Sequence, residues 1–409
     1  MSTDPRSGTG SLQAEVKGWL TANTDRSLTR KAWLERVVDA RWAVPTWPSQ
    51  WFGRDLTGDD RSVIDAEFTA AGVPGSGQDR WNLWANTVLA FGTDTLKGQV
   101  LRRLLTDDLA MCLLYSEPGA GSDLASLATR AERDGDEWVI NGQKVWTSGG
   151  RQAEYAFLLA RTNWDVSKHQ GISFFFFPMR QPGVEVRPLR QATGDARFNE
   201  VFLTDARVPH ANLLAGPGEG WKVLQTALAY ERIVMGLSDR GPARSKPAKS
   251  AATRDPTDEA SAPEPDLVLV ELARQRGRAD DPLIRPHLAR LHALRAVNGW
   301  NGGRAAAAMA NGTSSPLASL GKLAMSRILH YSASVEAQIL GAEAMIPGPG
   351  HERAAENTYA LLNAFFTSIG GGTDQIQRNS IAERLLGLPK EAEIDKGLPF
   401  REVKRTVAR

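Results

Sequence analysis

The sequence predicts an α+β protein in which a strand-rich middle region separates two helical regions. Apolar residues recur at helical spacing before about residue 108 and again after about residue 220, whereas short β-branched and aromatic runs fill the segment between them. A chain of 409 residues is too long for one simple core. We therefore expect a helical domain over residues 1–108, a β domain over 109–222 and a second helical domain over 223–409.

The first region is expected to be mostly helical. Leu12, Val16 and Leu20 recur at the spacing of one helix face. The segment 44–53 interrupts this pattern with Pro45, Pro48 and aromatic residues, which predicts a rigid loop because proline fixes the backbone and removes an N–H donor.

The middle region is expected to form a small β-barrel or sandwich. Residues 155–160 and 172–177 are apolar runs typical of buried strands, and residues 184–186 and 200–203 add further strands. Residues 137–140 and 143–146 flank the pair Asn141-Gly142, which is typical of a two-residue turn. We therefore expect these two runs to pair as a hairpin.

The third region is expected to be helical apart from an insertion at residues 239–266. This tract is rich in Pro, Ser and Ala, basic in its first half and acidic in its second. Low hydrophobicity with many prolines cannot support packing, so we expect it to be disordered, with a docking or regulatory role as the alternative.

Composition and charge exclude several classes of protein. The 49 basic and 47 acidic side chains nearly balance, which argues against nucleic-acid binding. Cys112 is the single cysteine, so internal disulfides are excluded and a reducing cytoplasm fits. No run approaches the ~18 apolar residues of a membrane span. The six histidines show no metal-ligand spacing, so we expect no metal site.

The stretch from Leu113 to Asp123, with the sequence LLYSEPGAGSD, is the most informative part of the chain. Its apolar start predicts a strand end, and Pro-Gly followed by Ala-Gly predicts a tight loop with accessible backbone. The hydroxyls of Ser116 and Ser122 and the loop N–H groups can donate hydrogen bonds. Such a loop suits a flat heterocycle on one side and a phosphate on the other.

Three motifs together resemble the acyl-CoA dehydrogenase family, and its bacterial, actinobacterial-type members in particular. They are SEPGAGSD at residues 116–123, NGQKVWTSG at 141–149 and GTDQIQRN at 372–379. The resemblance spans nearly the whole chain. It implies an N-terminal helical domain, a middle β domain and a C-terminal four-helix bundle, and it implies FAD as the cofactor.

The resemblance also implies the residues that contact FAD. They are Leu113, Tyr115, Ser116, Gly121, Ser122, Trp146, Thr147, Ser148, Gln338, Gly341, Gly372, Thr373, Asp374 and Gln375. Ser122 would also lie near the substrate thioester. Trp146 would cover one face of the isoalloxazine, and the alternative for this residue is a core tryptophan on a strand.

One phosphate-binding element of the family is missing from the chain. Gln338 and Gly341 resemble an element that touches the adenine-side phosphates in a neighbouring subunit, but the usual Arg-x-x-Phe-Gly is absent. Arg274, Arg276 or Arg278 is the candidate substitute for its arginine. The alternative is a solvated charged face.

The usual catalytic glutamate is also missing, because many relatives carry it where this chain has Gly371. A glycine cannot accept a proton, although its backbone N–H can still bind the thioester oxygen of the substrate. A second location must therefore supply the base.

Glu231 is the candidate for that base. It shares a predicted helix face with Leu224 and Leu228, and a carboxylate in an apolar stripe is costly unless it has a task or a partner. Some relatives, isovaleryl-CoA dehydrogenase among them, carry their base here, before an arginine that corresponds to Arg232. We expect Glu231 to accept the α-proton, with Arg232 near the substrate, and a structural Glu–Arg pair is the alternative.

The function that the resemblance implies is FAD-dependent α,β-dehydrogenation of an acyl-CoA to a trans-2-enoyl-CoA, in fatty acid or steroid degradation. Electrons would pass to an electron-transfer flavoprotein, and a homo- or heterotetramer or a dimer is expected. Two alternatives remain open. One is a partly competent subunit of a heteromeric acyl-CoA dehydrogenase, and the other is a flavin oxidase or monooxygenase on the same fold.

Overall fold

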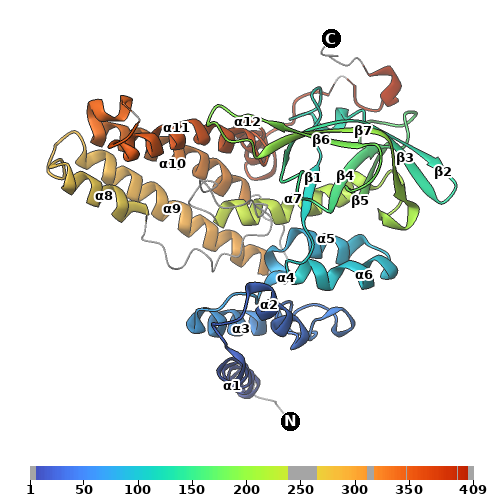
Figure 1. Ribbon diagram of the computed structural model, residues 1–409, viewed down its shortest axis with the longest axis horizontal. Helices are drawn as coiled ribbons and strands as arrows, with labels where there is room; N and C mark the ends of the chain where they lie inside the picture. Colours follow the sequence, from blue (N-terminus) through green and yellow to red (C-terminus); the bar gives the residue numbers. More distant parts are fainter. Residues whose placement is uncertain (1–5, 238–264, 311–316, 347, 394, 404–409) are drawn as a thin grey trace.

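The computed structural model describes residues 6–237, 265–310, 317–346, 348–393 and 395–403. A few side chains beside the gaps, including those of residues 232–237, are not described. Figure 1 shows N-terminal helices below a sheet, with long C-terminal helices beside the sheet. This arrangement confirms the predicted α+β class. The predicted insertion 239–266 lies outside the described residues except for Pro265 and Asp266, which begin helix α8.

The N-terminal helices are α1 (Arg6–Asn23), α2 (Arg30–Asp39), α3 (Gly58–Ala71), α4 (Gln78–Trp81), α5 (Leu83–Phe91) and α6 (Asp94–Leu105). Thr29, Thr57 and Thr93 start three of them, because each side chain accepts a hydrogen bond from a backbone N–H of the first turn. The Pro-rich loop closes tightly, since a Cβ at Gly53 would lie 1.9 Å from the Trp47 carbonyl oxygen.

The middle region forms one mixed sheet of eight strands. They are β1 (Met111–Leu114), β2 (Arg130–Asp134), β3 (Glu137–Ser148), β4 (Tyr155–Arg161), β5 (Ile172–Pro178), β6 (Val184–Leu189), β7 (Phe198–Pro209) and β8 (Leu213–Leu214). Their order is β6-β7-β3-β2-β4-β5-β8, and β1 pairs with β4 in parallel. The run of four phenylalanines in β5 is fully buried, which confirms the prediction of a buried strand.

The predicted hairpin turn at Asn141-Gly142 is wrong. β3 runs without a turn through this pair, and the hairpin lies between β2 and β3, where Asp134 pairs with Glu137. Gly142 instead sits at an irregularity in the register of β3 against β7. A Cβ there would lie 2.4 Å from the Thr129 hydroxyl, so the glycine is needed for close approach of two chain segments.

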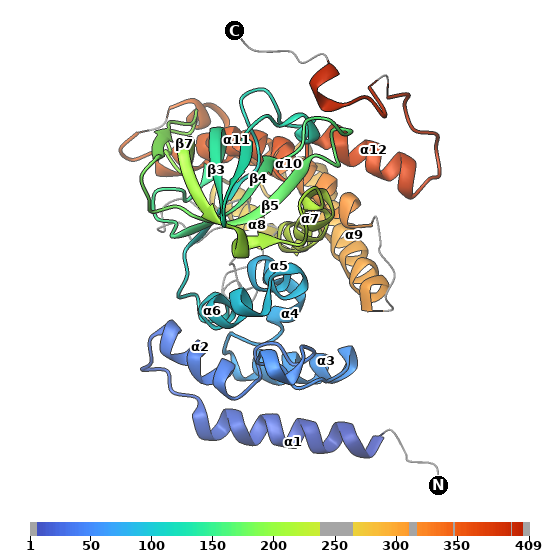
Figure 2. The same ribbon diagram turned by 90° about the vertical axis from the view of Figure 1, so that its right-hand side faces the viewer.

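The C-terminal helices are α7 (Gly220–Leu237), α8 (Pro265–Gln275), α9 (Arg285–Ala310), α10 (Leu317–Leu340), α11 (Glu352–Ile369) and α12 (Asp374–Arg384). α10 packs against α7, α9, α11 and α12. α7 lies between the other parts, because it also packs against α4, α5 and β5 (Figure 2). The chain then returns to the sheet, where the short helix η7 (Phe400–Glu402) is seated.

The largest hydrophobic cluster joins three parts of the chain. It contains residues of α1, α2, α3, α5 and α6, one face of the sheet, and Val223, Leu224 and Ala227 of α7. A second cluster fills the other face of the sheet and a third lies among α8, α9 and α10. Among the described residues, no helix is both long enough and apolar enough to cross a bilayer.

Candidate functional site

The first two sequence motifs meet where β1 ends beside β3. The Val145 N–H donates to the Ser116 carbonyl at 2.9 Å, and the Lys144 ammonium donates to the Tyr115 carbonyl at 3.0 Å. Strand β3 thus holds the backbone of the loop that follows β1. The resulting half-buried position of Ser116 leaves its hydroxyl next to the loop surface.

A buried ion pair fixes the same loop from inside. The ammonium of Lys144 lies 2.8 Å from the carboxylate of Glu117, which also accepts hydrogen bonds from the N–H groups of Ala128 and Thr129. Burial alone would raise the pKa of Glu117, but Lys144 and these hydrogen bonds outweigh it and lower the pKa. Burial lowers the pKa of Lys144, and the Glu117 charge opposes that change. Glu117 is therefore a structural anion.

Trp146 leaves the sheet at a bulge. The register of β3 against β7 shifts between Lys144 and Thr147, and Trp146 between them has a φ of +63°, which is uncommon for a bulky residue. The indole is 60 % exposed, so the alternative of a core tryptophan is excluded. Thr147 is buried instead and donates to the Leu113 carbonyl at 3.2 Å. Ser148 is exposed on the same strand.

Tyr115 points into the core, unlike its neighbours in the loop. Its ring meets Phe174 edge to face at 5.8 Å, and its hydroxyl is buried without a hydrogen-bond partner among the described residues. Burial, followed by the nearby charge of Glu231, raises the pKa of Tyr115 well above its ordinary value. The carboxylate of Glu231 is therefore near enough to the Tyr115 hydroxyl for its charge to act there.

Glu231 reaches that neighbourhood from α7. It is half-buried and follows Leu224 by two helical turns and Ala227 by one, and both of these residues are in the core. The preceding residue, Tyr230, lies toward the N-terminal helices, where burial and the charge of Asp79 raise its pKa. The side chain of Arg232 lies outside the described side chains. Glu231 therefore continues the face of α7 that bears Leu224 and Ala227.

The loop from residue 369 to 373 joins α11 to α12. Gly371 and Gly372 have φ values of +66° and +85°, in the left-handed region that favours glycine. The Gln377 amide donates to the Gly371 carbonyl at 3.0 Å, and Thr373 caps α12. Gln375 is exposed on the first turn of that helix.

A row of aromatic rings connects the loop of residues 369–373 to the second motif. Trp146 meets Phe198 at 5.9 Å, and Phe198 meets Phe366 at 5.3 Å. A Cβ at Gly370 would lie 2.9 Å from the Phe366 ring, so that ring packs directly on the glycine loop. Contacts therefore connect the first motif, through the second, to the glycine loop that precedes the third.

The carboxylate of Asp374 holds α12 onto α10. It accepts hydrogen bonds from the Lys322 ammonium at 3.2 Å and the Ser326 hydroxyl at 2.9 Å. Lys322 is fully buried, and burial lowers its pKa while Asp374 opposes the change. Sequence reasoning missed Lys322, because a lysine on a long helix carries no local sign of burial.

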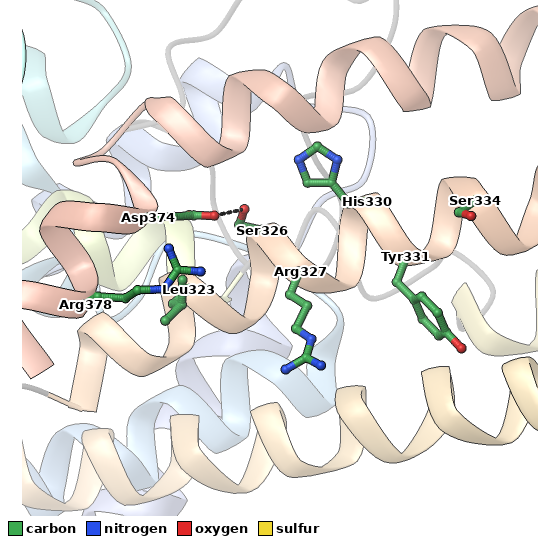
Figure 3. A pocket seen from close by; sticks show the side chains of 8 residues that line it. All are labelled: Leu323, Ser326, Arg327, His330, Tyr331, Ser334, Asp374 and Arg378. Carbon is green, nitrogen blue, oxygen red and sulfur yellow. Dashed lines mark hydrogen bonds between the residues drawn. The ribbon is translucent and has the colours of Figure 1, made fainter.

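A cavity of about 630 Å³ opens beside this contact, as Figure 3 shows. It is lined by Leu323, Ser326, Arg327, His330, Tyr331, Ser334, Asp374 and Arg378. Among the described residues, no ion-pair partner is found for Arg327 or Arg378, whereas Asp374 is already paired with Lys322. The cavity therefore carries excess positive charge and suits an anionic ligand.

The arginines that the sequence offered as phosphate ligands are in ion pairs. Arg274, Arg276 and Arg278 pair with Glu271, Glu343 and Asp281. Arg278 also donates to the Gln338 carbonyl, beside Gly341 with its φ of +62°. Arg276 and Arg278 thus bind the C-terminal end of α10 and the turn that follows it. Among the described residues, no group of three or more His, Cys, Asp or Glu side chains could hold a metal ion.

Comparison with protein families gives two matches along the chain. The acyl-CoA dehydrogenase middle-domain family matches residues 112–206, and the acyl-CoA dehydrogenase C-terminal-domain family matches residues 267–386. Acyl-CoA dehydrogenase IpdE1 of Mycobacterium tuberculosis is 36% identical over 93% of this chain and 98% of its own length.

Solved structures agree with the sequence comparisons. The Tcur3481-Tcur3483 steroid ACAD has a TM-score of 0.70 and 26% identity, covering 96% of this chain and 100% of that one. The ChsE4-ChsE5 complex from Mycobacterium tuberculosis has a TM-score of 0.67 and 27% identity, with coverage of 96% and 100%. These similarities cover the N-terminal helices, the sheet and the C-terminal helices alike.

Proposed function

Because the chain belongs to the acyl-CoA dehydrogenase family, and is an oxidoreductase by that membership, we propose that it dehydrogenates a bulky acyl-CoA with Glu231 as the base. The product is a trans-2-enoyl-CoA, and electrons leave to an electron-transfer flavoprotein. The observation that carries the assignment is the half-buried position of Glu231 on the face of α7 that bears the core residues Leu224 and Ala227. Its charge also acts on Tyr115 of the first motif.

The residues present fit FAD. The exposed indole of Trp146 offers a flat apolar face for a ring, and the half-buried Ser116 offers a hydroxyl beside it. The cavity beside α12 offers Arg327 and Arg378 to a diphosphate, and charge-assisted hydrogen bonds from guanidinium to phosphate are among the stronger ones. When bound, FAD supplies the hydride acceptor.

The chain's own residues carry the proton chemistry. Glu231, half-buried on the core face of α7, accepts the α-proton of the thioester as a general base. The Gly371 N–H binds the thioester oxygen and so stabilises negative charge on it. Ser122, exposed in the first motif, is assigned to the thioester side, and Arg232 follows the base in the sequence.

A bulky acyl group is the proposed substrate class. Residues 370–372 are three consecutive glycines and therefore place no side chain at the position where many relatives carry a glutamate. A solved relative is named a steroid ACAD, which supports a ring-bearing, steroid-derived acyl group for this chain. We place the reaction in steroid or fatty acid degradation on the same ground.

Replacing Glu231 by Gln tests the assignment of the base. The variant should keep bound FAD but lose turnover by roughly 10²-fold or more, since a positioned base contributes about 10²–10⁴-fold. Anaerobic titration with a panel of acyl-CoAs that includes a steroid side-chain acyl-CoA, followed by bleaching of the oxidised flavin, measures it. Glu200→Gln, a half-buried carboxylate on β7, is the control. Bleaching of Glu231→Gln at the wild-type rate would remove Glu231 from this role.

A second candidate function is that of one subunit in a heteromeric dehydrogenase. The solved ChsE4-ChsE5 relative is a complex of two named components, and this chain lacks a carboxylate at Gly371. Purification of the chain alone distinguishes the cases. A yellow, active tetramer or dimer favours a homo-oligomer, whereas a colourless protein that gains flavin and activity with a second polypeptide favours the heteromer.

A further inference from the structure

The loop between β4 and β5 is anchored to the segment that follows the first motif. Arg161, at the end of β4, is fully buried and donates to the carbonyls of Leu127 at 3.1 Å and Ala125 at 2.7 Å. These residues lie in and just after the short helix η2 (Leu124–Ser126), which begins directly after Asp123. Arg161 also donates to the Lys168 carbonyl at 3.0 Å. One side chain thus fixes both segments.

The segment around Phe400 packs against the same arginine. Phe400 is fully buried, and the Arg161 guanidinium lies 3.3 Å from the centre of its ring. The Phe400 N–H donates to the Val166 carbonyl at 2.9 Å, and the Arg401 N–H donates to the Trp164 carbonyl at 3.1 Å. Figures 1 and 2 both show this last segment beside the sheet and away from α9. We call residues 395–403 the C-terminal strap.

A bridging lysine connects the strap to the first motif itself. The Lys168 ammonium lies 3.0 Å from the Asp395 carboxylate and 3.3 Å from that of Asp123. Burial would lower the pKa of Lys168, but hydrogen bonds and charge from the two carboxylates outweigh it and raise the pKa. The last residue of SEPGAGSD is therefore linked to a residue more than 250 positions later through one cation.

The turn at residues 121–123 depends on such outside support. Gly121, Ser122 and Asp123 are exposed, and a Cβ added at Gly121 would meet nothing within 4 Å. Asp123 accepts a hydrogen bond from Ser126 inside its own turn, which leaves Lys168 to tie it to the rest of the fold. Exposed turns with few packed side chains are the parts of a protein that open most easily.

We propose that the C-terminal strap positions the turn at Gly121–Asp123, so that the loop which binds FAD and the thioester is set by residues 395–403. The strap acts through Arg161 and Lys168. The inference rests on the proposed function, because it takes this loop as the cofactor- and substrate-binding loop. It adds positioning residues, Phe400 and Asp395, to the binding site.

Phe400→Ala tests the strap in the full chain. It removes the ring beneath Arg161, and the dissociation constant of FAD for the apoprotein, measured by quenching of flavin fluorescence, should rise roughly tenfold, the equivalent of about 1.4 kcal/mol. The visible spectrum of bound flavin should lose fine structure as the turn loosens. Phe400→Tyr keeps the ring and should bind FAD like the wild type. Leu398→Ala, an exposed position in the same segment, is the control.

Asp395→Asn provides a test that does not disturb the core. It removes the partly exposed Lys168–Asp395 pair and should weaken FAD binding roughly two- to fivefold, in line with the small value of such pairs. Wild-type affinity and spectrum in both Phe400→Ala and Asp395→Asn would overturn the inference and leave the proposed function intact. A wild-type chain that binds no FAD would remove the proposed function, and the inference with it.

Discussion

The two halves of the candidate site are built in opposite ways. On the sheet side, the loop after β1 is held by backbone hydrogen bonds to β3 and by the buried Lys144–Glu117 pair. On the bundle side, Gly371 and Gly372 adopt left-handed conformations in the loop before α12. The neighbouring cavity carries Arg327 and Arg378, for which no ion-pair partner is found among the described residues. The charged groups of the sheet side are paired with one another, whereas the arginines of the bundle side are available to a ligand.

This difference separates stability from binding. Charges on the sheet side are buried and paired, so removing one leaves the other without compensation. On the bundle side, the cavity residues Arg327 and Arg378 are exposed, whereas Lys322, paired with Asp374 beside them, is fully buried. Removing one charge of a buried pair should therefore destabilise the protein, and replacing Arg327 or Arg378 should mainly weaken the binding of FAD.

The largest expected effect is that of Lys144→Met. It leaves Glu117 ionised in a buried position, and the free energy of unfolding should fall by about 3–5 kcal/mol. Chemical denaturation monitored by tryptophan fluorescence measures it. The double variant with Glu117→Gln should recover a large part of the loss, and Lys222→Met on the exposed face of α7 is the control. A loss below about 1 kcal/mol would mean that the pair does not fix the loop.

A smaller effect is expected when Arg327 and Arg378 are each replaced by Gln. Each change should weaken FAD binding roughly tenfold, because a hydrogen bond to a charged group contributes about 1.5–3 kcal/mol. The denaturation midpoint of the apoprotein should stay unchanged. Arg304→Gln, an exposed arginine on α9 outside the cavity, is the control. Unaltered FAD affinity would separate this cavity from the cofactor, and a lowered midpoint would remove the contrast between the two halves.

The smallest effect is the acid dependence of the sheet side. Glu117 has a folded-state pKa below its ordinary value of 4.5, so the stability it contributes is present above 4.5 and is lost as the pH falls through the lowered value. The free energy of unfolding of the wild type should exceed that of Glu117→Gln at pH 6, and this gap should narrow below pH 4.5. Denaturation curves from pH 6 to pH 3.5 measure the gap. A gap that stays constant would show that the Glu117 charge is not responsible.

The sequence predicted the order of the helical, strand-rich and helical regions, because glycines, prolines and apolar runs leave local signals. It did not predict which side chains of a motif are buried. Tyr115 and Thr147 lie in the same motifs as Ser116 and Trp146, yet both are buried. For Trp146 and Thr147 the bulge in β3 decides this, and a bulge depends on the partner strand.

Non-local contacts account for what sequence reasoning missed. Asn141-Gly142 has the local composition of a turn, but Gly142 is there because Thr129 approaches it closely. Likewise, Lys322 and Arg161 are long charged residues that usually lie at the surface, and only the fold shows that both are fully buried. Their partners, Asp374 and Phe400, lie far along the chain, where no spacing rule connects them.

The hydrophobic cluster that runs from α1 through one face of the sheet to α7 has a consequence for how the protein melts. The N-terminal helices and the sheet share this interior, so neither can open without exposing the other, although a sequence boundary near residue 108 separates them. Contiguous units of this kind unfold cooperatively. Heating should therefore release these two regions in a single calorimetric transition, and a fragment ending at residue 108 should fail to fold by itself.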